Sequence, residues 1–319
     1  MKMAAVIGTN RALKVESVSS VVTICTQQKR VRPSSVGTPA NLATNSQSEL
    51  QLAWSGALAA IPADTPAADL YAGRAFGLAK EAARLTDSAF YVASAGLGLV
   101  AGPTLVPPYG LTIARGGPES VLGKVVGPFD PAGWFESVLA GPHSTDWAHV
   151  GRAGSGRILV ALTKPYAELV GQSLSALPPG ALDRLRIFGA GLSVALPPAL
   201  RPAIVPYDPR LDALFPGTRS DFSQRAMLHF ARLVTHLPVD RLGDTEAVRA
   251  ALDMVDAPVW PKRLHRTDAE LLVIIAGRIA PRASASRLLR QLRDEDGIAC
   301  EQGRFARLFR TAAAGGVAT

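Results

Sequence analysis

Two aspartates lie where the sequence changes from strand-like to helix-like patterning. Asp208 falls in the segment 205–210, and Asp221 falls in the segment 219–225. A carboxylate in such a position can orient a water molecule or stabilise the oxocarbenium-like transition state of glycosyl-bond cleavage. Each aspartate also has a structural interpretation, because Asp221 and Gln224 have capping-box spacing and Asp208 suits a turn. We take both as candidate catalytic residues.

Reactive and basic side chains follow the first apolar run of the chain. Cys25 ends this run, and the residues after it include Thr26, Lys29, Arg30 and Arg32. A cysteine near a lysine can be a nucleophile with a lowered pKa, although a cysteine that ends a buried strand more often packs in the core. The three basic residues suit contact with phosphate groups. We expect Cys25, Thr26 and Lys29 to bind substrate.

A glycine-containing segment follows the second apolar run. Ser94, Gly96 and Gly98 form it, and glycine lets a backbone approach a ligand closely because it has no Cβ atom. The segment lacks the third glycine of a dinucleotide-binding fingerprint and the Gly-Lys-Ser/Thr ending of a P-loop. Tyr109 and Tyr166 lie beside prolines, where a tyrosine can stack on a flipped base, although each can equally close the core. All five residues are candidate substrate contacts.

The cysteine and histidine content predicts neither a metal site nor a cofactor. Cys25 and Cys300 are too few for a disulfide framework or a four-cysteine zinc site. The five histidines show neither HExxH nor paired Cys/His spacing.

Four short β-branched runs must position these residues. They are 21–25, 90–94, 157–162 and 185–188. Helical periodicity separates them, in 67–85, 131–139 and 166–177. This alternation predicts an α/β fold with a small parallel sheet of about four strands and flanking helices. Ligands of such sheets bind outside the carboxyl ends of the strands, which is where the candidate residues of the first two loops fall.

The chain becomes helical after residue 220. We expect helices at 221–234, 268–278, 284–296 and 301–311. Thr267 and Glu270 form a capping-box pattern at the start of the second of these. The sequence therefore predicts an α/β domain at 1–220, which carries the site, and a helical, basic region at 221–319.

Positive charge concentrates in the last sixty residues. The chain has 34 Lys and Arg against 26 Asp and Glu, a net charge of +8. Arg287 and Arg290 stand three residues apart on one predicted helix, and Arg304 begins a similar stripe on the next. Paired short helices with arginine stripes are typical of a helix-turn-helix or winged-helix module that grips DNA phosphates, and the alternative is an ordinary solvated face. We expect double-stranded DNA as the partner.

The chain has no apolar run of about 18 residues, the length a membrane-spanning helix needs. Its first twenty residues lack the apolar core of a signal peptide. We therefore expect no membrane contact and a cytoplasmic location.

The motifs of the first half resemble the YaaA-like superfamily, which includes peroxide-stress proteins and domains related to transglycosylase-like DNA modification proteins. The matching segments are Ile24-Cys25-Thr26-x-x-Lys29, Asp69-Leu70-Tyr71-Ala72-Gly73-Arg74-x-Phe76, Ser94-Ala95-Gly96-x-Gly98-Leu99 and Pro108-Tyr109.

Motifs of the second half resemble a subgroup of that superfamily associated with antiphage defence. They are Pro206-Tyr207-Asp208-x-Arg210, Gly217-Thr218-x-x-Asp221-Phe222-x-Gln224-Arg225 and Cys300-Glu301-Gln302-x-Arg304-Phe305. Some members of this subgroup are DNA glycosylases that excise glucosylated hydroxymethylcytosine from phage DNA. The resemblance implies this activity. A four-stranded parallel sheet with its site at the strand ends is also the layout of uracil-DNA-glycosylase-like enzymes, and we expect Arg225 to contact DNA.

Three other functions remain open at this point. The first is a non-catalytic DNA-binding stress protein, the second a transglycosylase-like enzyme that exchanges a base, and the third a hydrolase of nucleotides or other small molecules.

Overall fold

The computed structural model describes residues 17–259, 262–279 and 284–315. The N-terminal residues on which the expectation of no signal peptide rests lie mostly outside these ranges. The chain divides into two compact units, residues 1–257 and 258–319. In the described residues, no helix has the length and apolar character needed to cross a membrane.

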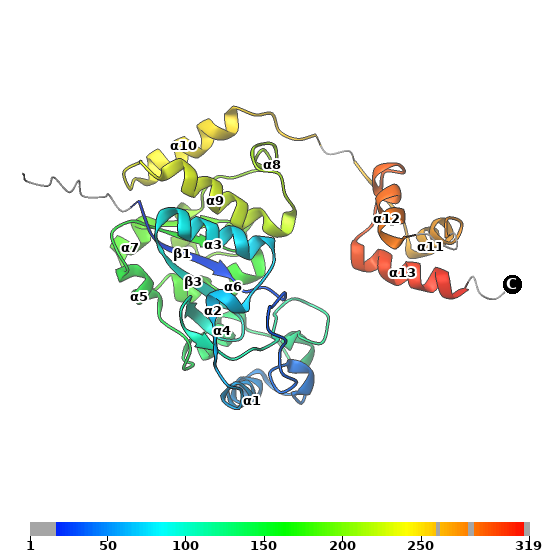
Figure 1. Ribbon diagram of the computed structural model, residues 1–319, viewed down its shortest axis with the longest axis horizontal. Coiled ribbons are helices and arrows are strands. Elements are labelled where there is room, and N and C mark those ends of the chain that lie inside the picture. Colours follow the sequence, from blue (N-terminus) through cyan, green and yellow to red (C-terminus); the bar gives the residue numbers. More distant parts are fainter. Residues whose placement is uncertain (1–16, 260–261, 280–283, 316–319) are drawn as a thin grey trace, which may run out of the picture. The chain divides into compact units, whose positions relative to one another are not determined.

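A five-stranded sheet of order β4-β3-β1-β6-β7 forms the centre of the first unit (Figure 1). Its four parallel strands confirm the four runs, and they are β1 (Val18–Ile24), β3 (Ala89–Ser94), β6 (Arg157–Ala161) and β7 (Leu185–Phe188). The fifth strand, β4 (Gly98–Ala101), pairs antiparallel with β3 and was missed by the sequence analysis. The segment containing Gly96 and Gly98 is therefore a hairpin turn rather than an open loop.

The continuous apolar runs form central strands because their alternate residues enter two different cores. On β6, Ile158 and Val160 pack in one cluster, whereas Leu159 and Ala161 pack in the other. All four side chains are fully buried. A strand covered on both faces has no polar alternation, which is the pattern that the sequence shows.

Helices cover both faces of the sheet (Figure 1). One face packs against α3 (Arg74–Thr86), α9 (Phe222–Val234) and α10 (Arg241–Asp253). The other face packs against α1 (Gln47–Ala59), α2 (Ala67–Leu70), α4 (Pro131–Leu139), α5 (Trp147–Arg152), α6 (Lys164–Leu174) and α7 (Pro179–Arg184). The helix expected at 67–85 is divided into α2 and α3 at Gly73, whose φ of 98° favours glycine.

Short elements complete the first unit. They are the paired strands β2 (Thr65–Pro66) and β5 (Leu105–Val106), helix α8 (Leu211–Leu214), and the 3₁₀ helices η1 (Pro39–Asn41), η2 (Val121–Lys124), η3 (Leu192–Val194), η4 (Pro198–Ala203) and η5 (Arg219–Asp221).

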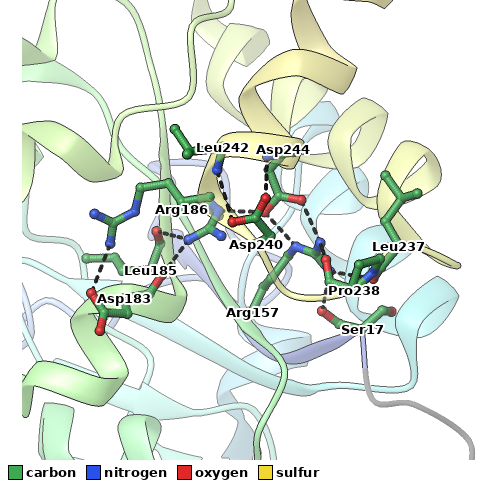
Figure 2. A network of polar contacts seen from close by, with 12 residues as sticks. Ser17, Arg157, Asp183, Leu185, Arg186, Leu237, Pro238, Asp240, Leu242 and Asp244 are labelled. Carbon is green, nitrogen blue, oxygen red and sulfur yellow. Dashed lines mark hydrogen bonds and ion pairs between the residues drawn. The ribbon is translucent and has the colours of Figure 1, made fainter.

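A buried ion cluster attaches α10 to the sheet (Figure 2). Asp244 accepts hydrogen bonds from Nε of Arg157 and from Nε of Arg186, each at 2.7 Å. Arg157 begins β6, Arg186 lies in β7, and all three side chains are at most 2% exposed. Arg157 also donates to the carbonyl oxygens of Ser17 and Leu237. This ion cluster therefore joins the amino ends of β6 and β7 to α10, which comes near the C-terminal end of the unit in the sequence.

The boundary between the two units lies after residue 257 and not after residue 220, where the sequence predicted it. Residues 221–257, which the sequence analysis grouped with the C-terminal helices, belong to the first unit. The physical reason is twofold. Helix α9 buries Met227 and Phe230 in the same core as Leu159 of β6, and Asp244 of α10 neutralises buried arginines of the sheet.

The described residues of the second unit form a small helical structure with its own core. Strands β8 (Leu264–His265) and β9 (Ile298–Ala299) pair in parallel, and the helices are α11 (Asp268–Ala276), α12 (Ala285–Asp294) and α13 (Gln302–Gly315). Leu271, Ile275, Leu289, Leu292 and Phe305 pack together in its core. The Thr267–Glu270 capping box is confirmed.

Candidate functional site at the carboxyl edge of the sheet

Residues from five separate segments meet near the carboxyl ends of β1 and β3. Cys25 Sγ lies 2.8 Å from the phenolic oxygen of Tyr166, and the phenolic oxygens of Tyr71 and Tyr109 are also 2.8 Å apart. The Tyr109 hydroxyl group is in turn hydrogen-bonded to Ser94. We call Cys25, Tyr71, Ser94, Tyr109 and Tyr166 the hydroxyl–thiol cluster. Four of its five members were candidate substrate contacts in the sequence, and Tyr71 was not.

The ammonium group of Lys29 lies over two aromatic rings of this cluster. Its Nζ atom lies 5.1 Å from the ring centroid of Tyr109 and 6.0 Å from that of Tyr71, within the range of cation–π attraction. The ammonium group also donates to the carbonyl oxygen of Thr26, and the Thr26 hydroxyl group donates to the carbonyl oxygen of Ala72. Thr26 therefore ties the loop after β1 to the segment before α3, and Lys29 is half-buried there.

Burial keeps the phenols of the cluster neutral. It raises the pKa of Tyr71, Tyr109 and Tyr166 well above the ordinary value, and the electrostatic interaction with Cys25 raises each further. A neutral phenol both donates and accepts hydrogen bonds. Along the hydroxyl groups of Tyr71, Tyr109 and Ser94, each group can therefore be donor or acceptor to the next. The neutral tyrosines cannot act as bases at neutral pH.

The glycine turn packs against this cluster. A Cβ atom on Gly96 would lie 2.5 Å from Cε2 of Tyr109, so the close backbone approach that glycine allows is to this ring. Ser94 Oγ accepts from the N–H groups of Gly96 and Leu97, which closes the turn. Gly98, at φ 79°, begins β4. Substrate contact by Gly96 and Gly98 stays a prediction, whereas the close backbone approach at Gly96 is made to a side chain of the protein itself.

Tyr109 and Tyr166 are not exposed stacking rings. Tyr109 is fully buried and Tyr166 is 8% exposed. The edge of the Trp54 ring packs against Tyr109, and Trp54 Nε1 donates to the carbonyl oxygen of Gly96. In this structure both tyrosines therefore act from within the protein, as hydrogen-bonding groups behind the surface.

Asp221 is a buried structural anchor. Its Oδ1 atom accepts from Nε of Arg225 at 2.7 Å and from the N–H group of Thr218, and Oδ2 accepts from Arg74 at 2.9 Å. The capping box is thus formed with Thr218 and not with Gln224, whose side chain donates to Thr23. The carboxylate is surrounded by donors and only 4% exposed.

Arg225 is not available to DNA in this structure. Its side chain is 1% exposed, pairs with Asp212 and Asp221, and donates to the carbonyl oxygens of Phe215 and Thr218. The DNA contact implied for this residue is replaced by a role in holding the loop before α9.

Asp208 is accessible but already paired. It accepts from Nε and Nη2 of Arg210 at 3.0 and 2.8 Å, and Arg210 also binds Asp253. Hydrogen bonds from Arg210 hold the pKa of Asp208 below its ordinary value. Within the described residues, no hydrogen bond or ion pair connects Asp208 or Asp221 to the hydroxyl–thiol cluster.

Two hollows are lined by segments that neighbour cluster residues in the sequence. The large hollow, of about 900 Å³, is lined by the loop 113–131 and by Pro165 and Glu168 of α6, which flank Tyr166. The small hollow, of about 480 Å³, is lined by residues 32–35 together with Pro118 and Glu119. Both volumes fall in the range of small-molecule pockets. The loop 113–131 was not among the predicted site segments, although its density of glycine and proline is a signal of irregular backbone.

Exposed cations without ion-pair partners lie in the segments that line these hollows or next to them in the sequence. In the described part of the chain, Arg30, Arg32, Arg115 and Lys164 form no ion pair, and all four are exposed. Arg32 lines the small hollow and Arg115 lines the large one. Phosphate contact by Arg30 and Arg32 stays a prediction, and both side chains are exposed.

The arginines of the second unit fall into two groups. Arg304 donates to Asp268 at 2.7 Å and to the carbonyl oxygen of Arg266, and Arg307 pairs with the same aspartate. Arg287 and Arg290 on α12 are exposed and have no ion pair among the described residues. The two helices thus differ in how much free positive charge they present.

The described residues hold no group of three or more His, Cys, Asp or Glu side chains placed to bind a metal ion. No family model, curated protein or solved structure matches the chain. The fold and the site define an α/β protein whose carboxyl sheet edge combines a buried hydroxyl–thiol cluster, a large hollow and unpaired cations.

Proposed function

We propose that the protein is a DNA N-glycosylase that removes a modified base and leaves an abasic site. The favoured substrate is glucosylated hydroxymethylcytosine in phage DNA, which makes the protein an antiviral enzyme of the cytoplasm. The observation that carries the proposal is the large hollow with exposed Arg115 in its lining, at the sheet edge where parallel α/β proteins bind ligands. The motif resemblance to YaaA-like antiphage glycosylases supplies the choice of reaction.

The reaction places three demands on the site. The base must leave the helix stack and enter a pocket, its departing electron pair must be stabilised by hydrogen bonds, and the sugar cation must meet a negative group and a water molecule. The large hollow answers the first demand, and the hydroxyl group of Ser120 in its lining is suited to the second. In this proposal the sheet edge has the arrangement of uracil-DNA glycosylase, and no cofactor or metal takes part.

Duplex binding is assigned to two basic surfaces. The edge cations Arg30 and Arg32 hold phosphates near the everted nucleotide, and the second unit grips the duplex as a helix-turn-helix-like module. Both surfaces act through charge, so the affinity falls as salt rises.

The proposal is tested by base release. Purified protein is incubated with a duplex that carries one glucosylated hydroxymethylcytosine, and abasic sites are detected by alkaline strand cleavage. We expect cleavage of this duplex and none of a matched duplex with plain cytosine. An intact modified duplex, over a range of salt concentrations at which the protein binds it, would contradict the proposal.

A second candidate is a non-catalytic DNA-binding protein. It is favoured by the engagement of both candidate aspartates with arginines, which leaves neither carboxylate free. This function predicts salt-dependent binding of modified and plain duplexes alike, unchanged by Asp208→Asn, without release of any base.

A further inference from the structure

We infer that the large hollow is the subsite for the everted nucleotide, and that Glu168 is the carboxylate which acts on its glycosyl bond. The inference rests on the proposed function and deepens it. The ligand class is a pyrimidine nucleotide that bears a polar, sugar-sized substituent on its base.

The lining of the large hollow matches such a ligand. Half-buried Phe129 and buried Ile113 supply apolar surface for a base. Exposed Arg115 supplies a cation for a phosphate group, and the glycines at 116, 117, 123 and 127 leave backbone groups uncovered by side chains. The volume of about 900 Å³ is near the upper end for ligand pockets, so it accommodates a base together with a bulky substituent.

Ser120 gives an independent indication of a polar ligand. This residue lines the large hollow and is only 5% exposed. Its Oγ atom has no hydrogen-bond partner in the described chain. Buried hydroxyl groups are nearly always hydrogen-bonded, so a serine without a partner at a pocket wall calls for one from outside the chain. A sugar hydroxyl group or a base edge can provide it.

Glu168 differs from the two aspartates that the sequence indicated. It lines the large hollow two residues after Tyr166, on the second turn of α6, and its carboxylate is exposed. No hydrogen bond or ion pair engages it within the described residues, whereas arginines hold both Asp208 and Asp221. A carboxylate at the pocket and free of arginine is the group that glycosyl-bond cleavage requires.

The chemical step is a hydrolysis. The C1′–N1 bond breaks and its electron pair leaves with the base, which then takes up a proton. The oxygen atom of a water molecule forms the new bond to C1′, and Glu168 accepts the proton that this water loses. The products are the free base and an abasic sugar.

Two variants test the inference, with Glu246→Gln, an exposed residue of α10, as the matched control. Glu168→Gln should lower single-turnover base release by roughly 10²–10⁴-fold, the usual contribution of a general base, while the affinity for the modified duplex is kept. Ser120→Ala should weaken binding of the free ligand, glucosylated hydroxymethyldeoxycytidine monophosphate, about tenfold by titration calorimetry. The control variant should match the wild type in both measurements.

The outcomes separate this inference from the proposed function. If the wild type releases the base and Glu168→Gln releases it equally fast, the role of Glu168 is overturned while the glycosylase proposal stands. If the free ligand binds with the same affinity to the wild type and to Ser120→Ala, the subsite is overturned. If the wild type releases no base at all, the proposed function and the role of Glu168 fail together, and the binding measurement alone decides the subsite. Thermal unfolding shows that each variant is folded.

Discussion

The thiol of Cys25 and the phenol of Tyr166 lie 2.8 Å apart, although 141 residues separate them in the sequence. Cys25 follows β1, and Tyr166 lies in the first turn of α6, which follows β6. Since β1 and β6 are parallel neighbours, both residues leave the sheet at the same edge. The contact therefore fixes how the loop after β1 lies against the helix whose next turn carries Glu168.

Removing the Tyr166 hydroxyl group should lower stability slightly and leave the fold unchanged. Tyr166→Phe deletes one buried hydrogen bond, which typically contributes about 0.5–1.5 kcal/mol to the free energy of unfolding. Urea unfolding measures the difference. Tyr91→Phe is the control, because no hydrogen bond engages the Tyr91 side chain in the described residues, and it should have the smaller effect. Equal losses in the two variants would mean that the Cys25 contact adds no stability.

Asp244 should be among the least replaceable residues of the first unit. Asp244→Asn leaves Arg157 and Arg186 buried with uncompensated positive charge, and breaking a buried pair in this way costs about 3–5 kcal/mol. Chemical unfolding measures this loss of stability, and a failure to obtain folded protein would also indicate it. The control is Asp183→Asn, because that carboxylate is 83% exposed and 3.9 Å from its partner Arg241. A loss below about 1 kcal/mol for Asp244→Asn, the level of a surface pair, would contradict this account.

The burial of the tyrosines predicts that the free energy of unfolding falls at alkaline pH. Burial raises the pKa of all five tyrosines of the chain, so the folded state keeps their protons at a pH where the unfolded state loses them. Stability is therefore retained below the unfolded pKa of about 10 and falls as the pH rises above it, by about 1.4 kcal/mol per pH unit for each such tyrosine.

Absorbance at the phenolate band measures this directly. The native protein should show little phenolate near pH 10 and a steep increase when it unfolds at higher pH. Protein in concentrated urea should titrate near pH 10 instead. A native titration that coincides with the one in urea would show that the phenols are accessible, contrary to the burial of the hydroxyl–thiol cluster.

The strands could be predicted from sequence because each is a contiguous apolar run whose burial on both faces suppresses alternation. Four residues of β4 after a glycine turn carry no such signal, so β4 was missed. The rule on the carboxyl ends of strands placed Cys25, Lys29 and Ser94 at one edge of the sheet, because they follow β1 or end β3. It did not place Tyr109, which follows β5 of a separate two-stranded sheet.

Other features depend on contacts that no local pattern encodes. Tyr71 follows a four-residue helix, and nothing nearby indicates that its hydroxyl group meets Tyr109. The same holds for Asp221 and Arg225, whose charge indicated an exposed function. Their burial results from Arg74, 147 residues from Asp221 in the sequence, and from the loop before α9.

Asp221→Asn should destabilise the protein whether or not it affects activity. The carboxylate balances Arg225 inside the protein, so its loss should cost about 3 kcal/mol, while Asp208→Asn at a surface pair should cost about 1 kcal/mol or less. Urea unfolding of both variants measures this. If Asp221→Asn is as stable as the wild type and loses base release, Asp221 is a catalytic group and not an anchor.

The arginines of the second unit should contribute unequally to DNA binding, because ion pairs already neutralise part of their charge. Replacing both Arg287 and Arg290 by Ala removes two free cations of α12. Under the proposed function this lowers the slope of log affinity against log salt by about 2, roughly one unit for each phosphate that the variant no longer binds. Arg304→Ala should change the slope less, because Asp268 already holds that guanidinium at 2.7 Å. Fluorescence anisotropy with a short duplex at several salt concentrations measures both slopes. An Arg304→Ala effect equal to that of the α12 pair would assign the DNA surface to α13, since the arginine must then exchange Asp268 for a phosphate on binding.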